Sequence, residues 1–390
     1  MNKMRHFSFI LLVLCSFITS LFANITTSTH QSVQTSLRNK GRSRITMQIE
    51  AIYQFGDSLS DTGNLVRETT RVKPAFARLP YGQTFFHRPT GRCSDGLLMV
   101  DYFAMYFHLP FLNPYLAKGS DFTKGANFAV AGATALDASV LAAQNISGPV
   151  TENSLRIQLQ WFRSLLHTTF SNPREIKRKL ENALVLMGEI GGNDYNLAFF
   201  QGKTLEQVYQ LVPNVVQTIK YAVQEVIWLG ATNIVVPGNF PIGCVPLYLV
   251  RFETNDKSKY DELQCLKDYN DFSKYHNELL IRAIQELQQE HPNVAIVYGD
   301  YYYALTWVIK HAPRLGFERG GSTKVCCAIG NNPYNYDLKK SCGSPGVPIC
   351  EDPSKRISWD GIHMTQEGNK NVAIWLLKNS LPTLRTHFHP

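Results

Sequence analysis

Residues 52–64 read Ile-Tyr-Gln-Phe-Gly-Asp-Ser-Leu-Ser-Asp-Thr-Gly-Asn, which predicts a short buried strand that runs into a Gly-Asp-Ser turn. Such a turn would hold Ser58 at the carboxyl end of the strand, where α/β folds keep their chemistry. The Ser58 N–H would also lie at the positive end of the following turn, where a developing oxyanion can be stabilised. A Gly-Asp-Ser turn alone is common, so catalysis by Ser58 requires partners elsewhere in the chain.

Apolar strands alternate with amphipathic helices along the rest of the chain, a pattern that predicts a parallel sheet covered on both faces. The predicted strands are 51–55, 126–132, 183–187, 233–237 and 294–298. The predicted helices are 97–107, 154–167, 204–229 with a bend near Pro213, 269–290, and 366–378 with Thr365 as its cap. Because right-handed crossovers leave few alternatives, we expect an α/β fold. It would be a flavodoxin-like, three-layer α/β/α sandwich with a five-stranded parallel sheet.

Residues 1–23 have the layout of a cleaved secretory signal, with Lys3 and Arg5 before an apolar run and small residues near Ala23. A membrane anchor is the alternative, but the run is short and is interrupted by serine and threonine. No other stretch is long and apolar enough to span a bilayer, so we expect entry into the secretory pathway and no stable membrane association.

Residues 24–48 are polar, contain no acid and predict a flexible segment outside the fold. The formal net charge of the chain is +8; two of the basic residues lie in 1–23 and four in 24–48, which leaves +2 for the remainder. The basic balance therefore needs no nucleic acid to explain it. Residues 49–390 are compatible with a single α/β domain that carries large loops.

Cysteine usage favours an oxidising compartment. Cys244 and Cys265 bracket one loop, and one bridge is expected there. Two more bridges are expected in a later loop, where strain disfavours a vicinal bridge and leaves two pairings open among Cys326, Cys327, Cys342 and Cys350. A zinc site is the alternative, but adjacent cysteines rarely point at one tetrahedral ion, so no metal site is expected. Cys93 is then a buried free thiol, and Asn145 begins a glycosylation sequon.

A serine nucleophile needs a base within hydrogen-bond reach and a carboxylate that keeps this base in the right tautomer. His363 is the best candidate base, because Asp360 lies three residues earlier on a loop just before the last predicted helix. A loop of that length can fold Asp360 back onto one imidazole nitrogen while the other nitrogen faces Ser58.

Oxyanion donors are the next requirement. Gly132 ends the second predicted strand, where the missing side chain lets a backbone N–H approach a substrate. Asn193 follows the third predicted strand, and its amide could reach the same point. Ser58, Gly132 and Asn193 thus follow successive strands at the edge where such a sheet binds ligands. Asp57 is interpreted as a structural acceptor for N–H groups of the turn.

Four blocks in this order resemble those of the plant GDSL esterase/lipase family within the SGNH hydrolases, over essentially the whole body of the chain. They are 55–64 (Phe-Gly-Asp-Ser-Leu-Ser-Asp-Thr-Gly-Asn), 127–133 (Asn-Phe-Ala-Val-Ala-Gly-Ala), 190–195 (Ile-Gly-Gly-Asn-Asp-Tyr) and 359–363 (Trp-Asp-Gly-Ile-His). The resemblance implies the SGNH hydrolase fold and a Ser58, His363 and Asp360 triad. It also implies an oxyanion hole formed by Ser58, Gly132 and Asn193, with no cofactor.

Three further motifs resemble the acetylajmalan-esterase and sinapine-esterase type: 90–96 (Thr-Gly-Arg-Cys-Ser-Asp-Gly), 240–246 (Phe-Pro-Ile-Gly-Cys-Val-Pro) and 333–337 (Pro-Tyr-Asn-Tyr-Asp). One departure is Ala328 after the cysteine pair, where the family usually carries glycine. That subgroup hydrolyses small acetyl or hydroxycinnamoyl esters of specialised metabolites, alkaloids among them. Aromatic residues of 67–89, 245–252 and 301–307 could form the walls of an apolar pocket, although packing under long loops also explains each of them.

We therefore expect a serine esterase that acts on small-molecule esters in the apoplast, cell wall or vacuole, with no obligate protein partner. An acyltransferase with the same acyl-enzyme and a general lipase are the alternatives within enzyme chemistry. A wall-binding protein with an idle site is the alternative from another class, and the intact Ser58, Asp360 and His363 argue against it.

Overall fold

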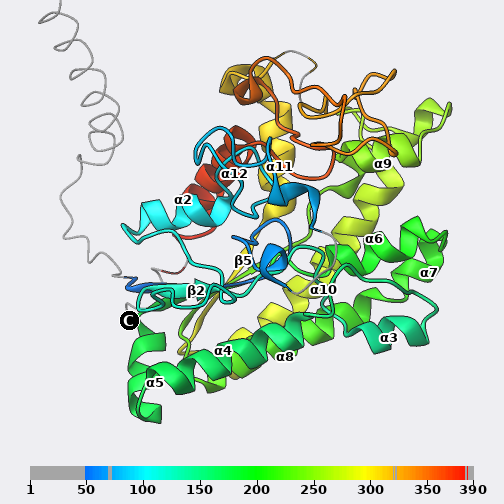
Figure 1. Ribbon diagram of the computed structural model, residues 1–390. Coiled ribbons are helices and arrows are strands. Elements are labelled where there is room, and N and C mark those ends of the chain that lie inside the picture. The colour runs from blue at the N-terminus through cyan, green and yellow to red at the C-terminus, as the bar shows by residue number, and fades with distance from the viewer. Residues whose placement is uncertain (1–48, 69–72, 319, 321–322, 383, 385–390) are drawn as a thin grey trace, which may run out of the picture. The chain divides into compact units, whose positions relative to one another are not determined.

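A five-stranded parallel sheet lies at the centre of this computed structural model, which describes residues 49–68, 73–318, 320, 323–382 and 384 (Figure 1). The strands are β1 (Ala51–Phe55), β2 (Gly125–Asn127), β3 (Ala183–Met187), β4 (Asn233–Pro237) and β5 (Ala295–Gly299). Their order is β2-β1-β3-β4-β5, and every neighbouring pair is parallel. The predicted α/β fold is confirmed. The predicted signal and the predicted flexible segment of 24–48 lie outside the described residues.

The strand predicted over 126–132 is too long, since β2 ends at Asn127. The following segment still runs beside β1, and Val130 N donates to Gly56 O at 3.1 Å. The chain then turns, with Ala133 N donating to Val130 O at 2.9 Å. The apolar residues of 128–131 are buried by this course although they form no strand. The apolar run therefore predicted correctly that these residues are buried, but the strand predicted from it is wrong beyond Asn127.

Helices cover both faces of the sheet. Figure 1 shows α4 and α8 on one side of it and α2, α11 and α12 on the other. The helices over the described residues are α2 (Met99–Tyr106), α3 (Ala138–Ala143), α4 (Leu155–Thr169), α5 (Pro173–Glu181), α6 (Gly192–Phe200), α7 (Leu205–Tyr209), α8 (Val212–Trp228), α9 (Pro246–Arg251), α10 (Lys267–Glu290), α11 (Tyr301–Lys310) and α12 (Gln366–Asn379). In the core under α4, Tyr53, Phe55 and Phe128 pack around Phe162 with ring centroids 5.1–5.6 Å from it.

The helix predicted over 204–229 is two helices, α7 and α8. Thr204, the first residue of the predicted helix, caps α7 by accepting a hydrogen bond from Gln207 N. Pro213 lies in the first turn of α8, where its missing N–H costs no hydrogen bond within the helix. The predicted bend near Pro213 is therefore wrong, because this proline lies at the start of a separate helix.

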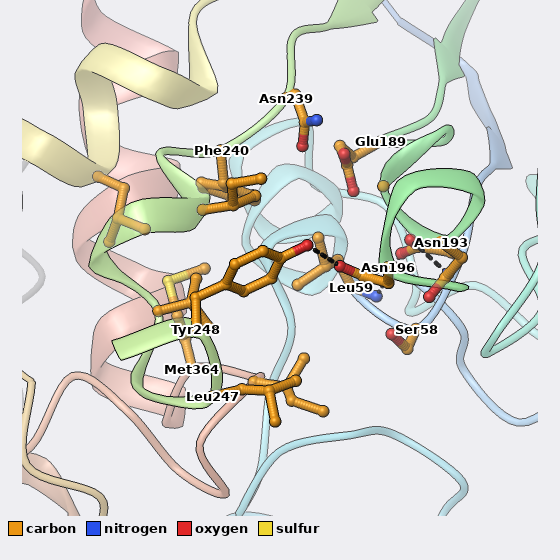
Figure 2. Close-up of a pocket in the computed structure, with 16 residues that line it drawn as sticks. Ser58, Leu59, Glu189, Asn193, Asn196, Asn239, Phe240, Leu247, Tyr248 and Met364 are labelled. Atoms are coloured by element: carbon orange, nitrogen blue, oxygen red, sulfur yellow. Dashed lines mark hydrogen bonds between the residues drawn. The ribbon is translucent and has the colours of Figure 1, made fainter. Parts of the chain in front are cut away.

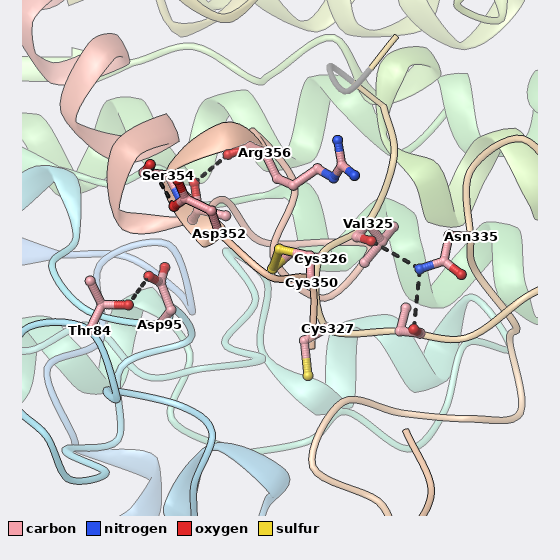
Figure 3. The surroundings of a disulfide bond; sticks show 12 residues. Thr84, Asp95, Val325, Cys326, Cys327, Asn335, Cys350, Asp352, Ser354 and Arg356 are labelled. Carbon is pink, nitrogen blue, oxygen red and sulfur yellow. Dashed lines mark hydrogen bonds between the residues drawn. A yellow bond between two sulfur atoms is a disulfide. The ribbon is translucent and has the colours of Figure 1, made fainter. Parts of the chain in front are cut away.

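In the described part of the chain, three disulfides cross-link the loops: Cys244–Cys265, Cys326–Cys350 and Cys327–Cys342. The predicted bridge of the first loop is confirmed, and the second loop adopts one of the two pairings left open. Figure 3 shows Cys326 and Cys327 side by side in the chain with their sulfur atoms apart. Cys93 is buried and free, as expected.

Asn145 is exposed just after α3, with φ of +55°, and its glycosylation stays a prediction. Among the residues that the structure describes, no helix is both long enough and apolar enough to cross a membrane.

Candidate active site

The turn after β1 holds Ser58 at the carboxyl edge of the sheet. Gly56 has φ of +137°, and a Cβ atom there would lie 2.7 Å from the carbonyl oxygen of Glu189, so only glycine fits. Asp57 stabilises the turn with both its backbone carbonyl and its side chain. Its carbonyl accepts from Ser60 N and Asp61 N, and its carboxylate Oδ1 accepts from Leu59 N at 2.9 Å. The predicted structural role of the Asp57 side chain agrees with these contacts.

Asp61 joins this turn to the loop that contains Gly132. Its fully buried carboxylate accepts hydrogen bonds from the backbone N–H groups of Gly63, Asn64 and Leu65. It also accepts from Ala131 N at 2.9 Å. Sequence reasoning missed this role, although an aspartate two residues before a glycine is typical of a side chain that closes its own turn. The contact with Ala131 joins residues 70 positions apart and carries no such local signal.

Ser58, His363 and Asp360 form a continuous hydrogen-bonded chain. His363 Nε2 lies 2.8 Å from Ser58 Oγ, and His363 Nδ1 lies 2.8 Å from Asp360 Oδ2. Asp360 Oδ1 accepts from His363 N at 2.8 Å, so the aspartate holds both the ring and the backbone of the histidine. This is the arrangement in which a histidine can take the serine proton while a carboxylate fixes its tautomer.

The charges of His363 and Asp360 shift each other's pKa. Burial alone would lower the pKa of His363, but the charge of Asp360 and its hydrogen bond outweigh burial and raise it. Burial alone would raise the pKa of Asp360, but the charge of His363 and hydrogen bonds from His363 and Tyr81 lower it. Asp360 therefore stays ionised, and His363 is a stronger base than a free imidazole.

Tyr81 also contacts Asp360, a role that was not predicted from the sequence. Its hydroxyl donates to Asp360 Oδ2 at 2.8 Å, and its buried ring packs edge-on against Trp359. Tyr81 belongs to the aromatic residues of 67–89 that could have formed a pocket wall, and it supports the Asp360 carboxylate instead. The loop of 359–363 is closed by Trp359 N, which donates to His363 O at 2.8 Å.

The loop of 326–350, which contains two disulfides, also supports the segment before Asp360. Cys326 N donates to Ser358 O at 3.0 Å, and Cys327 N donates to Trp359 O at 2.7 Å. Figure 3 shows the Cys326–Cys350 bridge in these surroundings. The residues directly before Asp360 are thus held to a cross-linked segment, which limits the movement of the carboxylate.

Two of the predicted oxyanion donors present open backbone N–H groups. No hydrogen bond to another residue in the described part of the chain engages the N–H of Ser58 or of Gly132. Gly132 has φ of +83°, and a Cβ atom there would lie 2.5 Å from Cβ of Val150. A larger residue is excluded both by the backbone conformation and by Val150.

Asn193 lies in the first turn of α6, after Gly191 with φ of +108°. Its amide Nδ2 donates to Asp57 Oδ2 and to Ala133 O, both at 3.0 Å. The structure therefore brings Asn193 to the Ser58 turn as expected, but both of its amide hydrogens are engaged by protein acceptors. Burial raises the pKa of Asp57 to about 7, against the opposing effects of Leu59 N and of the charge of His363.

A cavity that is open to solvent begins at Ser58 and is shown in Figure 2. Its walls are largely apolar and include Leu59, Phe240, Ile242, Leu247, Tyr248 and Met364. Of the aromatic residues expected as possible pocket walls, Tyr248 is among those that line the cavity, whereas Tyr301 packs beside Phe240 and Phe85 packs against Phe86 and Phe111. Within the described ranges, no group of three or more His, Cys, Asp or Glu side chains is arranged to hold a metal ion.

Known proteins are similar in sequence to this chain over most of its length. A family model described as GDSL-like lipase/acylhydrolase matches residues 52–376. Acetylajmalan esterase 1 of Rauvolfia serpentina is 43% identical over 341 residues, which are 87% of this chain and 88% of that protein. A GDSL esterase/lipase of Arabidopsis thaliana is 44% identical over 365 residues, 93% of this chain and 91% of that protein. The chain belongs to the GDSL-like lipase/acylhydrolase family, which acts on small-molecule esters, and it is a carboxylic ester hydrolase.

Proposed function

We propose that this hydrolase acts through an acyl-enzyme on Ser58, with His363 as general base and Asp360 as the residue that orients it. The observation that carries the proposal is the pair of 2.8 Å contacts from the two ring nitrogens of His363 to Ser58 Oγ and Asp360 Oδ2. Ser58 Oγ attacks the ester carbonyl and gives its proton to His363, which passes it to the departing alcohol. Water then attacks the acyl-enzyme by the same route and releases the acid.

The oxyanion of each tetrahedral intermediate is proposed to bind the N–H groups of Ser58 and Gly132 and the amide of Asn193. The open N–H groups of Ser58 and Gly132 support this role without rearrangement. For Asn193, one N–H would turn from Asp57 or Ala133 toward the oxyanion. The acceptor that this N–H does not leave, Ala133 O or Asp57 Oδ2, would still hold the other N–H and keep the amide in position.

The proposed substrate is a small acetyl or hydroxycinnamoyl ester of a plant specialised metabolite such as an alkaloid. Similarity to acetylajmalan esterases at 43% and 44% identity supports this class. The largely apolar walls of the cavity beside Ser58 also favour an ester with an apolar body. We also propose that the enzyme enters the secretory pathway and works in the apoplast, cell wall or vacuole, which three disulfides support.

A hydrolysis panel with the purified protein tests this function, with Ser58→Ala as the blank. The panel runs from p-nitrophenyl acetate to long-chain esters and includes acetylated alkaloids and hydroxycinnamoyl esters. We expect the highest kcat/KM for small acyl groups on bulky natural alcohols, and labelling of Ser58 by an organophosphonate. Preference for long chains would make the enzyme a lipase. Labelling with turnover only when an acceptor alcohol is added would make it an acyltransferase, and equal hydrolysis by Ser58→Ala would refute the assigned nucleophile.

A further inference from the structure

Glu189 is a buried acid in the cavity that the proposed reaction does not use. It follows β3, its side chain lines the cavity, and only 3% of its surface is exposed. In the described structure its carboxyl group makes no hydrogen bond or ion pair with another residue. A carboxyl group that is so little exposed, has no protein partner and reaches only the cavity is costly unless something in the cavity pairs with it.

Asn239 contributes a second unpaired polar side chain to the same cavity. It is 3% exposed, and its backbone is held by Asn277, which accepts from Asn239 N at 2.7 Å and donates to Asn239 O at 3.0 Å. Its side-chain Nδ2 is buried and has no hydrogen-bond partner among the described residues. Its Oδ1 accepts no hydrogen bond from another described residue either, and Figure 2 shows this oxygen on the cavity side of the amide. Figure 2 shows the amide of Asn239 and the carboxyl group of Glu189 on the same side of the cavity, across from the apolar Leu247.

The charged groups that act on Glu189 are Asp57 and Asp194, and both are acidic. Burial first, and then the nearby charges of Asp57 and Asp194, raise the pKa of Glu189 well above its usual range. Burial also raises the pKa of Asp194 to about 7. No lysine or arginine lines the cavity among the described residues. A bound cation would lower the energy of an ionised Glu189, because it would supply the opposite charge that the protein does not place there.

We propose that Glu189 and Asn239 form a subsite for a protonated amine on the ester substrate, an inference that rests on the proposed function of the Ser58 site. An ammonium group donates several hydrogen bonds, so it can bind the Glu189 carboxylate and Oδ1 of Asn239 together, although it offers no acceptor to Asn239 Nδ2. A hydroxyl group has one hydrogen to donate and brings no charge. The apolar walls formed by Phe240 and Leu247 would contact the carbon skeleton that carries the amine.

A matched pair of acetate esters tests the subsite: piperidin-4-ylmethyl acetate and cyclohexylmethyl acetate, which differ only in a protonated ring nitrogen. We expect the wild-type protein to favour the amine ester by about ten- to a hundredfold in kcat/KM, mainly through KM, as for a hydrogen bond to a charged group. In Glu189→Gln this ratio should fall to within about threefold. Glu278→Gln, which removes the same charge from the exposed face of α10, should keep the wild-type ratio.

Binding of the two product alcohols, piperidin-4-ylmethanol and cyclohexylmethanol, to the wild-type protein is measured by calorimetry. This measurement needs neither turnover nor a variant that folds. Tighter binding of the amine by about tenfold or more supports the subsite even if neither ester is hydrolysed, in which case the proposed esterase function fails and the subsite does not. Equal binding of the two alcohols, or an unchanged ester preference in a folded Glu189→Gln protein, would overturn the proposal.

Discussion

Ser58 follows a strand of the sheet, whereas His363 lies on a loop before α12, and yet their side chains meet at 2.8 Å. The Ser58 turn is built mainly from short-range parts: β1, the positive φ of Gly56, and carboxylates that bind the N–H groups of their own turns. Long-range hydrogen bonds to the same carboxylates, from Ala131 N and the Asn193 amide, are added to this local frame. The loop of 359–363 has no strand beneath it. Instead, Tyr81 and the disulfide-linked loop hold it through contacts with partners far away in the sequence.

The difference predicts how the two halves of the site respond to mutation. Changes to the Ser58 turn remove groups that would touch the reacting atoms directly. Changes to the supports of the 359–363 loop leave those groups in place and alter how well Asp360 and His363 are held. We therefore expect large losses of rate for the proposed catalytic and oxyanion groups, and smaller, graded losses for the residues that position them.

After Ser58→Ala, which removes the nucleophile, the largest effect is expected for Asp360→Asn, a loss of about 10⁴-fold in kcat, because the neutral amide no longer holds the required tautomer of His363. The pH profile should also change. His363 must be neutral to accept the Ser58 proton, so activity rises with pH through its pKa, which Asp360 raises. Without that charge, the acidic limb of kcat/KM should move to lower pH. A limb that stays in place would show that another group titrates there.

Asn193→Ala should reduce kcat by about a hundred- to a thousandfold if its amide is an oxyanion donor. KM should change little, because the lost interaction belongs to the transition state. The melting temperature of the variant serves as the control, since Asp57 also loses a hydrogen bond in it. A loss of rate below tenfold would assign the oxyanion to the N–H groups of Ser58 and Gly132 alone.

Tyr81→Phe should lower kcat by about tenfold, the order expected when a hydrogen bond to a charged carboxylate is removed. Tyr81 is a positioning residue, so KM for a small ester should stay near the wild-type value. Tyr336→Phe is the matched control, because its ring packs beside Gly361 while its hydroxyl makes no hydrogen bond among the described residues. Equal losses in both variants would point to general disturbance of the loop.

Replacing both Cys327 and Cys342 by serine should have the smallest effect on rate, about threefold in kcat, together with a loss of about 2–4 kcal/mol in the free energy of unfolding. The two cysteines are 15 residues apart in the sequence. A double Cys244→Ser, Cys265→Ser protein provides the comparison, since its bridge spans a similar 21 residues but does not hold Trp359. We expect similar losses of stability in the two proteins and a loss of rate confined to the first. Equal rates would show that hydrogen bonds alone hold the loop.

Secondary structure was predictable where a buried segment is also a short apolar run that ends in turn residues. The bounds of β1, β3 and β4 are as predicted, because each is a short apolar run closed by turn residues. Helix α6 was missed because Gly192 and Asn193 are typical of turns, and here they form the first turn of a helix that Gly191 starts. Helix α11 was also missed, although Asp300 caps it by accepting from Tyr303 N at 2.9 Å and could have been identified from the sequence.

Sequence alone was enough to predict a sheet of five parallel strands, the candidate triad, the turn after β1 and the place of Gly132, because these depend on local conformation and on strand ends that a parallel sheet brings to one edge. Tertiary structure alone decided which partners hold the site. Tyr81 and Asp360 are 279 residues apart, and no periodicity links them. The choice between the two disulfide pairings and the unpaired Glu189 and Asn239 beside Ser58 also depend on how distant loops pack. Contacts between such loops depend on the whole fold, so no local pattern records them.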